Sequence, residues 1–397
     1  MGEVTDIRDA SAHQARFSLA GEVLRAVHAE PQITRAGLAR RLGMSSGVAA
    51  DTVRRLVASE LLIEGPPIAT RARGRPTRAL GPHPQGPLVA VAAVAHESWE
   101  VAAVEVGGGI LERRERPHGR DRARVLGEVA LALRAVCERY RSRVRAIAIS
   151  VPGTVSGARL VQASNLGWLD VDLLALRPRR AAALPLLAGN DATFSAVAEA
   201  RRGAAVGAVS SVHIYMDSGV GGAIIDAGRV VLGANGRAGE FGHMPFGRRD
   251  ALCRCGARGC WNTILDGTAW ARALGRPSPA DEVSFSRDVL TAARAGRGPE
   301  SRIVEHAAAG LGRGIAGLVN ALDPEIVTVG GLARELVDIA GDRVDRAYRK
   351  GLMAAIAAHP PTIAVGALGE RAPMLGAAEH AFDAVLQDPA LATWNAA

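Results

Sequence analysis

The segment AGEFGHMPFGRRDALCRCGARGC, residues 238–260, contains three of the four cysteines of the chain. Cys253, Cys255 and Cys260 follow a single histidine, His243. One imidazole and three thiolates are the donor set of a closed tetrahedral zinc site, and the glycines between the cysteines let the backbone curl around an ion. A disulfide within a Cys-x-Cys pair is geometrically disfavoured. The segment therefore predicts a structural zinc ion, with no coordination position left open for catalysis.

A second group of polar residues points to a ligand site near this loop. Glu240 lies three residues before His243, and Asn190-Asp191 follows the apolar segment 184–189. Carboxylates and amides at strand ends can hold the hydroxyl pairs of a polyhydroxylated ligand. An Asn-Asp pair is more often a helix cap, and that alternative stays open.

Strands alternate with helices from Leu88 onward, and this order predicts an α/β architecture with mixed sheets. Glycine turns at 219–222 and 330–331 favour two lobes with a cleft between them. The expected strands are 88–95, 99–106, 144–153, 184–190, a hairpin over 210–226, 326–331 and 362–368. The expected helices lie near 122–141, 192–203, 265–275, 284–320 and 372–387.

Three short helical segments precede this part of the chain. The first is expected from Phe17 to Glu30 and is stopped by Pro31. Thr34 can cap the second, which closes at Gly43, and a serine at 45 or 46 can cap the third. This is helix-turn-helix spacing, although a small helical adaptor with a solvated basic face has the same pattern. Base-reading positions on the third helix would be its outward residues: Ser46, Ala50, Asp51, Arg54 and Arg55.

A basic stretch follows, where the wing of a winged helix-turn-helix would lie. Arg73 and Arg75 flank Gly74 and precede Pro76. Two arginines separated by glycine can lie along a narrow minor groove, where the negative potential attracts guanidinium groups. A flexible basic linker is the alternative. The Pro- and Gly-rich residues 81–87 then indicate an interdomain linker.

Composition limits the class of protein. The 397 residues carry a net charge of +8, and 47 of the 48 basic residues are arginine, which is also the signature of GC-rich coding. Nine arginines against three carboxylates between residues 35 and 80 place most of the excess charge in the N-terminal part. The polar N-terminus, the few cysteines and the absence of a long apolar run predict a cytoplasmic protein without a membrane span.

Several motifs over residues 86–388 resemble the ROK family, which groups repressors, uncharacterised open reading frames and sugar kinases. They are ISVPGTVSG (149–157), ASNLGWLDVDL (163–173), GNDATFSAVAEA (189–200), DSGVGGAII (217–225), AGEFGH (238–243), CRCGARGC (253–260) and LVNALDPEIVTVGG (318–331). The resemblance implies an N-terminal winged helix-turn-helix followed by a body of two ribonuclease-H-like lobes, as in actin and hexokinase. The implied domains are 1–80 for DNA binding, 81–87 as linker, 88–198 with the helix 372–388 as lobe 1, and 199–371 as lobe 2 with the zinc loop.

The family contains both kinases and repressors, and two motifs separate them. Kinases carry Asp-x-Gly-x-Thr in the first hairpin, whereas the equivalent segment here, residues 91–101, reads VAAVAHESWEV. Without that loop, ATP loses the backbone cradle of its phosphates and a carboxylate near the metal. Gly74-Arg75-Pro76 matches a Gly-Arg-Pro that the repressors share. The chain is therefore expected to be no enzyme but a sequence-specific transcriptional repressor, similar to the xylose- and N-acetylglucosamine-type repressors of the family.

The resemblance also implies ligands and partners. Asn190, Asp191, Glu240 and His243 match sugar contacts of the family, and Asp191 matches its catalytic base. Asn262 stands where the family usually has a glutamate that binds a sugar hydroxyl. Expected partners are a double-stranded DNA operator, a sugar-type effector and further copies of the chain, in a homodimer or homotetramer. The alternatives are an ATP-dependent sugar kinase with a DNA-binding head, and a DNA-binding protein that senses no ligand.

Overall fold

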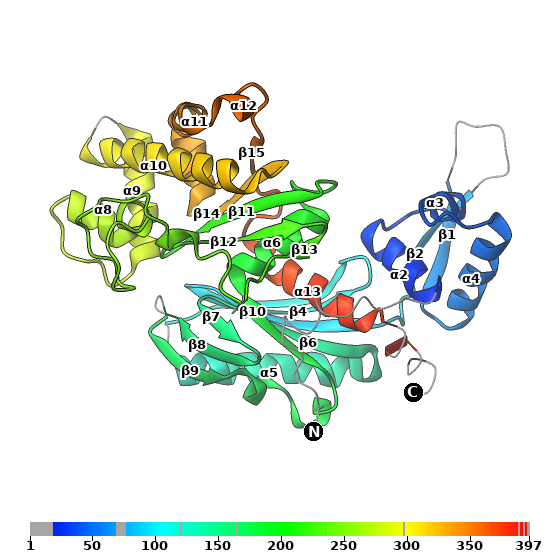
Figure 1. Cartoon of the computed structure of the whole chain (residues 1–397). Coiled ribbons are helices and arrows are strands. Elements are labelled where there is room, and N and C mark those ends of the chain that lie inside the picture. Colours follow the sequence, from blue (N-terminus) through cyan, green and yellow to red (C-terminus); the bar gives the residue numbers. More distant parts are fainter. Residues whose placement is uncertain are drawn as a thin grey trace. The chain divides into compact units, whose positions relative to one another are not determined.

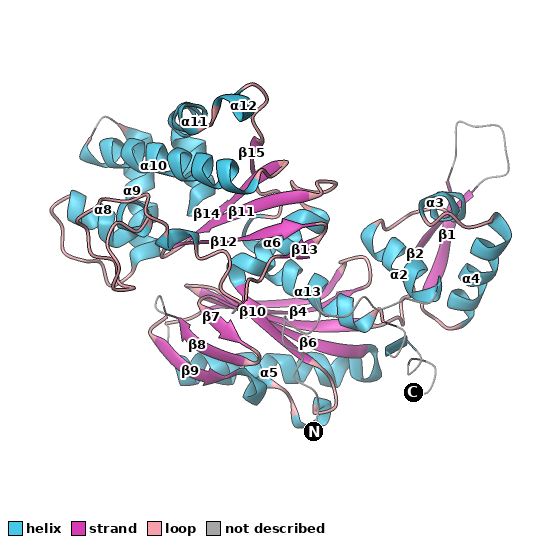
Figure 2. Cartoon of the chain, viewed as in Figure 1, coloured by secondary structure: helices cyan, strands magenta, loops and turns pink. Residues whose placement is uncertain are grey.

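The computed structural model describes residues 19–68, 77–119, 121–163, 166–234, 236–296, 298–387, 390, 391 and 394. Contacts divide the chain into two compact units (Figures 1 and 2). Unit 1 comprises residues 1–163, 167–190 and 377–397, and unit 2 comprises residues 164–166 and 191–376. Among the described residues, no helix has the length and apolar character needed to cross a membrane.

The head of unit 1, drawn in blue in Figure 1, has the three helices expected from the sequence, followed by a pair of strands on either side of the stretch where a wing was expected. Thr34 and Ser45 cap the second and third helices, since their side chains accept hydrogen bonds from the amides of Gly37 and Val48. Gly43 adopts a φ of +64° in the turn between these helices, a conformation that favours glycine. The elements are α2 (Leu19–Ala29), α3 (Arg35–Arg41), α4 (Ser46–Ala58), β1 (Leu62–Ile68) and β2 (Thr77–Pro82), and β1 pairs with β2 antiparallel.

The rest of unit 1 is built on a five-stranded sheet of order β10-β6-β3-β4-β5. The apolar run of β3 is buried along its whole length, as expected for a central strand covered on both faces. Helix α5 (Arg122–Tyr140) packs along one face of the sheet. The strands are β3 (Leu88–Val94), β4 (Ser98–Glu105), β5 (Ile110–Pro117), β6 (Val144–Val151) and β10 (Leu186–Asn190), with β3, β6 and β10 parallel.

A small three-stranded sheet in unit 1 was not expected from the sequence. It consists of β7 (Thr154–Ser156), β8 (Arg159–Ala163) and β9 (Trp168–Asp172), in antiparallel order. These strands are short and contain mostly exposed residues, so they lack the continuous apolar pattern that identifies β3 and β6. Strand β5 was missed for a similar reason, because its residues are largely charged and exposed.

Unit 2 contains the second five-stranded sheet, of order β13-β12-β11-β14-β15. Its strands are β11 (Ser210–Met216), β12 (Val220–Asp226), β13 (Arg229–Val230), β14 (Ile326–Gly331) and β15 (Thr362–Val365). Its helices are α6 (Asp191–Arg202), α7 (Asn262–Leu265), α8 (Gly267–Ala273), α9 (Glu282–Ala295), α10 (Pro299–Leu322), α11 (Leu332–Gly351) and α12 (Ala354–Ala357). Helix α13 (Ala372–Val385) begins in unit 2 and ends in unit 1.

The single helix expected over 284–320 is wrong, because the structure has two helices there. Helix α9 ends at Ala295 and α10 begins at Pro299. Gly296 is extended, and Pro299 lacks the amide that would continue the preceding helix, so a proline at this place starts a helix instead.

The head is joined to the body of unit 1 by hydrogen bonds as well as by the chain. The His28 imidazole at the end of α2 lies with Nε2 3.0 Å from Glu379 Oε2 on α13, while its Nδ1 accepts the Gly107 amide at 2.9 Å. The Trp394 indole donates to the Ser59 carbonyl, which caps α4. Both ring nitrogens of buried His28 therefore have partners in the body.

Candidate functional site

The predicted zinc ligands meet at one place in unit 2. Ligand atoms of His243, Cys253, Cys255 and Cys260 all lie within 4.8 Å of one another. The Cys253 Sγ is 3.8 Å from His243 Nδ1, and the Cys255 and Cys260 sulfurs are 3.6 Å apart. Tetrahedral zinc with Zn–S bonds of about 2.3 Å places sulfurs about 3.8 Å apart, so these separations fit the ion. The group can thus hold a metal, and its donor chemistry matches zinc.

The two nitrogens of His243 face different neighbours. Nδ1 faces Cys253, whereas Nε2 lies 3.9 Å from Glu240 Oε2. A histidine that binds a metal through one nitrogen commonly presents the other to a carboxylate, which fixes the ring. Glu240 precedes the short turn η4 (Phe241–His243), His243 is the last residue of that turn, and both side chains are partly exposed. This geometry joins the predicted ligand residue Glu240 to the metal group.

Local backbone bonds shape the cysteine loop. The Cys253 amide donates to the Ala257 carbonyl, and the Gly247 amide donates to the Gly259 carbonyl. Gly256 and Gly259 have φ values of +92° and +77°, which an L side chain would strain. The loop can therefore turn back within a few residues and bring Cys260 next to Cys253 and Cys255.

The end of the loop is anchored in the core of unit 2. Trp261 directly follows Cys260, is fully buried, and donates from its indole nitrogen to the Gly310 carbonyl on α10. Gly314 leaves the space that the Trp261 ring fills, because a Cβ there would lie 2.1 Å from the ring. A change at Cys260 is consequently transmitted to the helical core.

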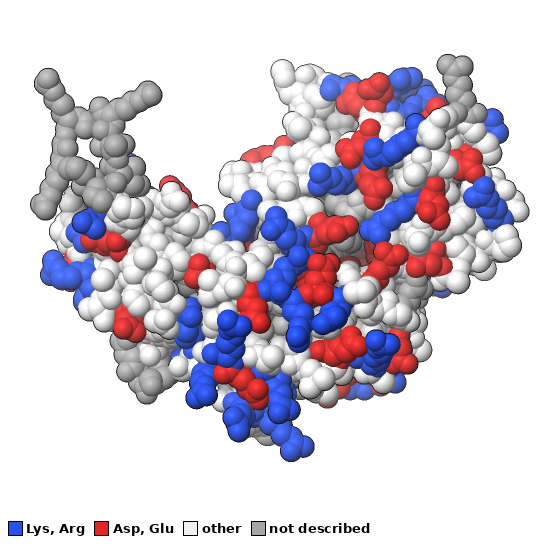
Figure 3. Space-filling model, turned by 180° about the vertical axis from the view of Figure 1, so that it is seen from behind, with Lys and Arg blue, Asp and Glu red and all other residues white. Residues whose placement is uncertain are grey.

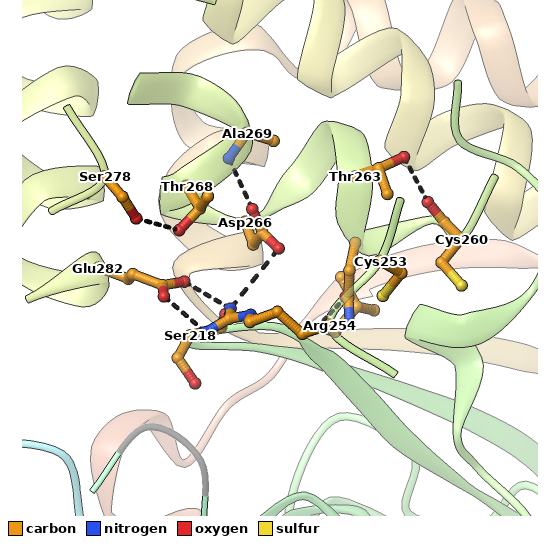
Figure 4. Close-up of polar contacts among 12 residues, drawn as sticks. Ser218, Cys253, Arg254, Cys260, Thr263, Asp266, Thr268, Ala269, Ser278 and Glu282 are labelled. Atoms are coloured by element: carbon orange, nitrogen blue, oxygen red, sulfur yellow. Dashed lines mark hydrogen bonds and ion pairs between the residues drawn. The ribbon is translucent and has the colours of Figure 1, made fainter. Parts of the chain in front are cut away.

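Arg254, which sits between two of the cysteines, ties the loop to other parts of unit 2 (Figure 4). Its guanidinium makes two hydrogen bonds of 2.7 Å to the Glu282 carboxylate on α9. It also donates to the Ser218 carbonyl in the glycine turn between β11 and β12, at 3.4 Å, and lies 3.7 Å from Asp266. Arg254 was not predicted as a site residue, because its only signal in the sequence is its position inside the cysteine motif.

Asp266 caps α8 beside this arginine. Its carboxylate accepts the Ala269 amide at 2.7 Å. Burial raises the pKa of Asp266 from 3.8 to about 6, although that hydrogen bond and Arg254 act in the opposite direction. The folded protein therefore holds this proton more tightly than the unfolded chain.

We expect Asp266→Asn to stabilise the protein selectively at neutral pH. Because the folded pKa is raised, the ionised carboxylate destabilises the fold as the pH rises from about 4 through 6, by up to about 3 kcal/mol. Asparagine keeps the capping oxygen without the charge. Urea unfolding at pH 4.5 and 7.5 measures the difference, with Asp281→Asn at the cap of α9 as a control for the substitution. Parallel pH profiles of wild type and Asp266→Asn would contradict this assignment.

The other predicted ligand residues are placed as follows. Asn190 ends β10 in unit 1, and its amide donates to the Gly153 carbonyl at 2.8 Å. Asp191 begins α6 in unit 2, where its carboxylate accepts the Ala192 amide. Asp191 thus bonds to the backbone at the start of α6, as the helix-cap alternative expected. Its contact with a ligand stays a prediction.

Asn262 has a clear partner inside unit 2. Its Oδ1 accepts the Val220 amide at 2.8 Å, at the start of β12. Gly219 and Gly242 leave room for it, since a Cβ at Gly242 would lie 2.4 Å from that oxygen. Asn262 therefore links the residue after the zinc loop to the glycine turn, and its Nδ2 remains the group on which a ligand contact would depend.

The predicted DNA contacts fall partly within the described residues. Ser46, Asp51, Arg54 and Arg55 are exposed on α4, and Ala50 is half-buried. Arg73 and Arg75, between β1 and β2, lie outside the described residues. Their contribution to DNA binding stays a prediction.

Comparison with known proteins identifies the family. Residues 95–383, which are 289 of the 397, match the family model described as the ROK family. The chain belongs to the ROK family. The resemblance seen in the sequence is thereby confirmed, as is the actin- and hexokinase-like fold that it implied.

Relatives within the family include enzymes and a regulator. This ROK protein is 31% identical over 252 residues to a glucokinase of Halalkalibacterium halodurans, which covers 59% of this chain and 72% of that enzyme. A solved ROK family transcriptional regulator, a homologue of the Escherichia coli MLC protein, matches with a TM-score of 0.73 and 25% identity, covering 95% of this chain and 98% of that one. The ROK hexokinase of Thermus thermophilus matches with a TM-score of 0.60 and 29% identity, covering 73% and 96%.

Proposed function

We propose that this ROK protein is a DNA-binding transcriptional repressor whose body binds a sugar or sugar derivative as effector. One observation carries the proposal. The solved ROK regulator matches 95% of the chain, so its match includes most of the head, whereas the Thermus thermophilus hexokinase matches 73%. A match that includes the head supports the organisation of a regulator, in which a DNA-binding head precedes the body.

The turn between β3 and β4 supports a regulator over a kinase. Its residues are Ala95, His96 and Glu97, in place of the phosphate-binding motif of the kinases. The Ala95 amide donates to the Ser98 carbonyl at 2.8 Å, and the His118 ring lies 3.1 Å from the Ala95 carbonyl. An amide bonded within the turn is not available to a phosphate, and the exposed Glu97 carboxylate would repel one.

Several carboxylates lie near the glycine turn between β11 and β12. Burial raises the pKa of Tyr215 well above its usual value, and the carboxylates of Asp217, Asp191 and Glu370 raise it further, while Arg287 lowers it. Arg254 and Arg287 offset part of this negative charge, and the remaining excess of carboxylates disfavours the phosphates of a nucleotide. These surroundings suit an uncharged polyhydroxylated ligand better than ATP.

The third helix of the head has the charges needed for DNA binding. Asp51 lies 3.3 Å from Arg54 and 3.4 Å from Arg55, and both guanidinium groups are largely exposed. Exposed ion pairs of this kind contribute about 0–1 kcal/mol, so DNA can replace them at little cost. In a homodimer or homotetramer, two heads would read the half-sites of a pseudo-palindromic operator.

Helix α13 connects α6, where the effector would bind, with the head. Gly376 packs so tightly on α6 that a Cβ there would lie 1.7 Å from the Phe194 carbonyl oxygen. Further along the same helix, Glu379 pairs with His28 of the head. A ligand held at Asp191, the first residue of α6, would shift α13 and thereby the head. That shift is limited by the difference in ligand affinity between the two states. A structural zinc ion would keep His243 and Glu240 in place for the same ligand.

The double variant Arg54→Ala with Arg55→Ala tests the DNA-binding proposal. Each lost contact to a base or phosphate is expected to cost about 1–3 kcal/mol, so affinity should fall at least tenfold. Duplexes are first selected from a random pool by the zinc-loaded full-length protein, and affinities are then measured by fluorescence anisotropy. Arg294→Ala with Arg302→Ala removes the same charge from α9 and α10 and should bind as wild type. If no duplex is enriched, or if affinity is unchanged, the proposal is wrong.

A sugar kinase with an appended DNA-binding head is the second candidate. The 31% identity to a glucokinase and the presence of Asp191 favour it. Release of ADP that depends on glucose would establish this activity. DNA affinity that no sugar changes would instead favour a protein that senses no ligand.

A further inference from the structure

A second basic surface lies in unit 1, at one edge of the five-stranded sheet. It is formed by the end of α5 and by two short turns, η1 (Arg141–Arg143) and η3 (Arg179–Ala181). We call it the basic edge, and its residues are Arg139, Arg141, Arg143, Arg177, Arg179 and Arg180. In the view of Figure 3, Lys and Arg side chains gather at the lower end of the molecule with few carboxylates among them.

Sheet topology brings the two turns together. Strands β6 and β10 are parallel neighbours, with Ile147 opposite Leu186. The turn η1 directly precedes β6, and η3 precedes β10 by a few residues. Since parallel strands begin at the same edge of a sheet, both turns lie at that edge. The Ile147 amide accordingly donates to the carbonyl of Pro185, just before β10.

The charge of the basic edge is poorly neutralised. The segments 139–169 and 173–189 contain no aspartate or glutamate. Arg141, Arg179 and Arg180 are exposed, and none of them has an ion pair within the part of the chain that the structure describes. The nearby carboxylates belong to other segments: Glu112 lies 3.4 Å from Arg139, and Glu105 interacts with Arg143.

Aromatic and backbone contacts hold part of the basic edge in place. The guanidinium carbons of Arg139 and Arg143 lie 5.8 and 5.6 Å from the centre of the Tyr140 ring. Cation–π contacts of this kind restrict the arginine side chains while leaving their N–H groups available for anions. Arg143 also donates to the Gly86 carbonyl of the linker at 3.0 Å.

The head is connected to this same edge. The linker ends at Leu88, which pairs with Val144 at the start of β6. The Arg145 guanidinium lies 5.6 Å from the centre of the Trp394 ring, and the Trp394 indole donates to Ser59 at the end of α4. Trp394 therefore links the end of the candidate recognition helix to Arg145 on β6, two residues after Arg143 of the basic edge.

We propose that the basic edge binds the phosphate backbone of duplex DNA next to the segment that the head reads. The inference rests on the proposed DNA-binding function and adds a second contact surface outside the head. Arg141, Arg179 and Arg180 have no ion pair among the described residues, arginine suits phosphate oxygens, and the basic edge lies where the linker enters the body. An acidic protein would be the competing partner, but the connection to α4 favours DNA.

Salt dependence of binding tests the proposal. The full-length zinc-loaded protein is titrated against a labelled 40-bp duplex of mixed sequence between 50 and 200 mM NaCl. In the triple variant Arg141→Ala, Arg179→Ala, Arg180→Ala, the slope of log K against log salt should fall by about 2 to 3, because each phosphate contact contributes about 0.9. At 0.1 M salt this corresponds to about an eightfold loss of affinity for each contact. The corresponding triple lysine variant should keep most of the slope.

Matched variants distinguish this inference from the proposed function. Arg294→Ala, Arg302→Ala, Arg346→Ala removes the same charge from exposed positions of unit 2 and should leave the slope unchanged. The inference would be overturned if the Arg141, Arg179, Arg180 variant kept the wild-type salt slope while the Arg54, Arg55 variant lost DNA affinity. The proposed function would stand in that case. Equal loss in both triple alanine variants would also overturn it, as a general charge effect. Loss of poly-glutamate binding without loss of DNA binding would indicate an acidic protein partner instead. If the wild-type protein retains no duplex at 50 mM salt, both proposals fail.

Discussion

Cys260→Ser is expected to abolish tight zinc binding and to destabilise unit 2. The variant leaves three of the four donors, and a serine hydroxyl is a poor zinc ligand. Cys260 is 1% exposed and adjacent to Trp261, whose ring fills the helical core, so the released loop leaves a large side chain poorly held. Loss of a structural metal is among the most destabilising single-site changes, and it lowers the free energy of unfolding by on the order of 5 kcal/mol or more. Inductively coupled plasma mass spectrometry measures the zinc content, and thermal unfolding measures the loss of stability.

Cys137→Ser is the matched control for this change. Cys137 lies on α5 in unit 1, whereas the other three cysteines belong to unit 2, and burial raises the pKa of its thiol to about 11. Its replacement should leave about one zinc ion per chain and cost no more than about 1 kcal/mol. A Cys260→Ser protein with normal zinc content, or a wild-type protein whose melting temperature does not respond to chelators, would refute a structural zinc site.

A substitution of the histidine ligand tests the link between zinc and the sugar ligand. His243 presents Nδ1 to Cys253 and Nε2 to Glu240, so loss of the ion should also disorder the predicted ligand residues. His243→Ala should therefore lose zinc and sugar response together. Full sugar response in a zinc-free variant would separate the two functions.

The zinc group could be predicted because its donors are close in sequence and chemically specific. The caps Thr34 and Ser45 were predictable for the same reason, since each acts within one helical turn. The break between α9 and α10 had a local signal, because residues 296–299 read Gly-Arg-Gly-Pro, but the helical pattern on both sides concealed it. Local chemistry thus accounts for most of what the sequence predicted correctly.

The contacts that sequence reasoning missed are those between distant segments. Arg254 reaches Glu282 and Ser218, which lie 28 and 36 residues away. Asn262 accepts a hydrogen bond from the Val220 amide, so a residue expected to contact a ligand also stabilises the glycine turn. No periodicity or spacing identifies such partners, because they depend on how helices and strands pack.

Glu199→Ala is expected to be the most destabilising change outside the zinc group. The Glu199 carboxylate, on α6, is 1% exposed. One oxygen accepts the amides of Ala204 and Ala367, at 2.8 and 3.0 Å, and the other accepts the Leu368 amide at 3.0 Å. The three amides are only partly buried, so the loss of each acceptor is expected to cost the lower part of the usual range of about 1–3 kcal/mol, about 3–5 kcal/mol in total. Urea unfolding monitored by circular dichroism measures it.

Conservative and control variants show whether hydrogen bonding causes this loss. Glu199→Gln keeps the shape of the side chain but turns an amide N–H toward a backbone N–H. Its stability should therefore lie between that of the wild type and that of Glu199→Ala. Glu305→Ala removes an exposed carboxylate 3.8 Å from Arg343 and should change stability by less than about 1 kcal/mol. A Glu199→Ala protein as stable as the Glu305→Ala protein would contradict the role assigned to the buried carboxylate.

Two glycines extend the same argument to the position of the ligand site. A Cβ at Gly203 would lie 2.0 Å from one Glu199 oxygen, and a Cβ at Gly366 would lie 2.8 Å from the other. Gly366→Ala should therefore destabilise the protein in the same direction as Glu199→Ala, by displacing the carboxylate from the three amides. Because α6 begins at Asp191, either variant should also weaken sugar binding at temperatures where the protein remains folded. Unchanged sugar affinity in folded Gly366→Ala would show that the anchor at Glu199 supports the fold without positioning Asp191.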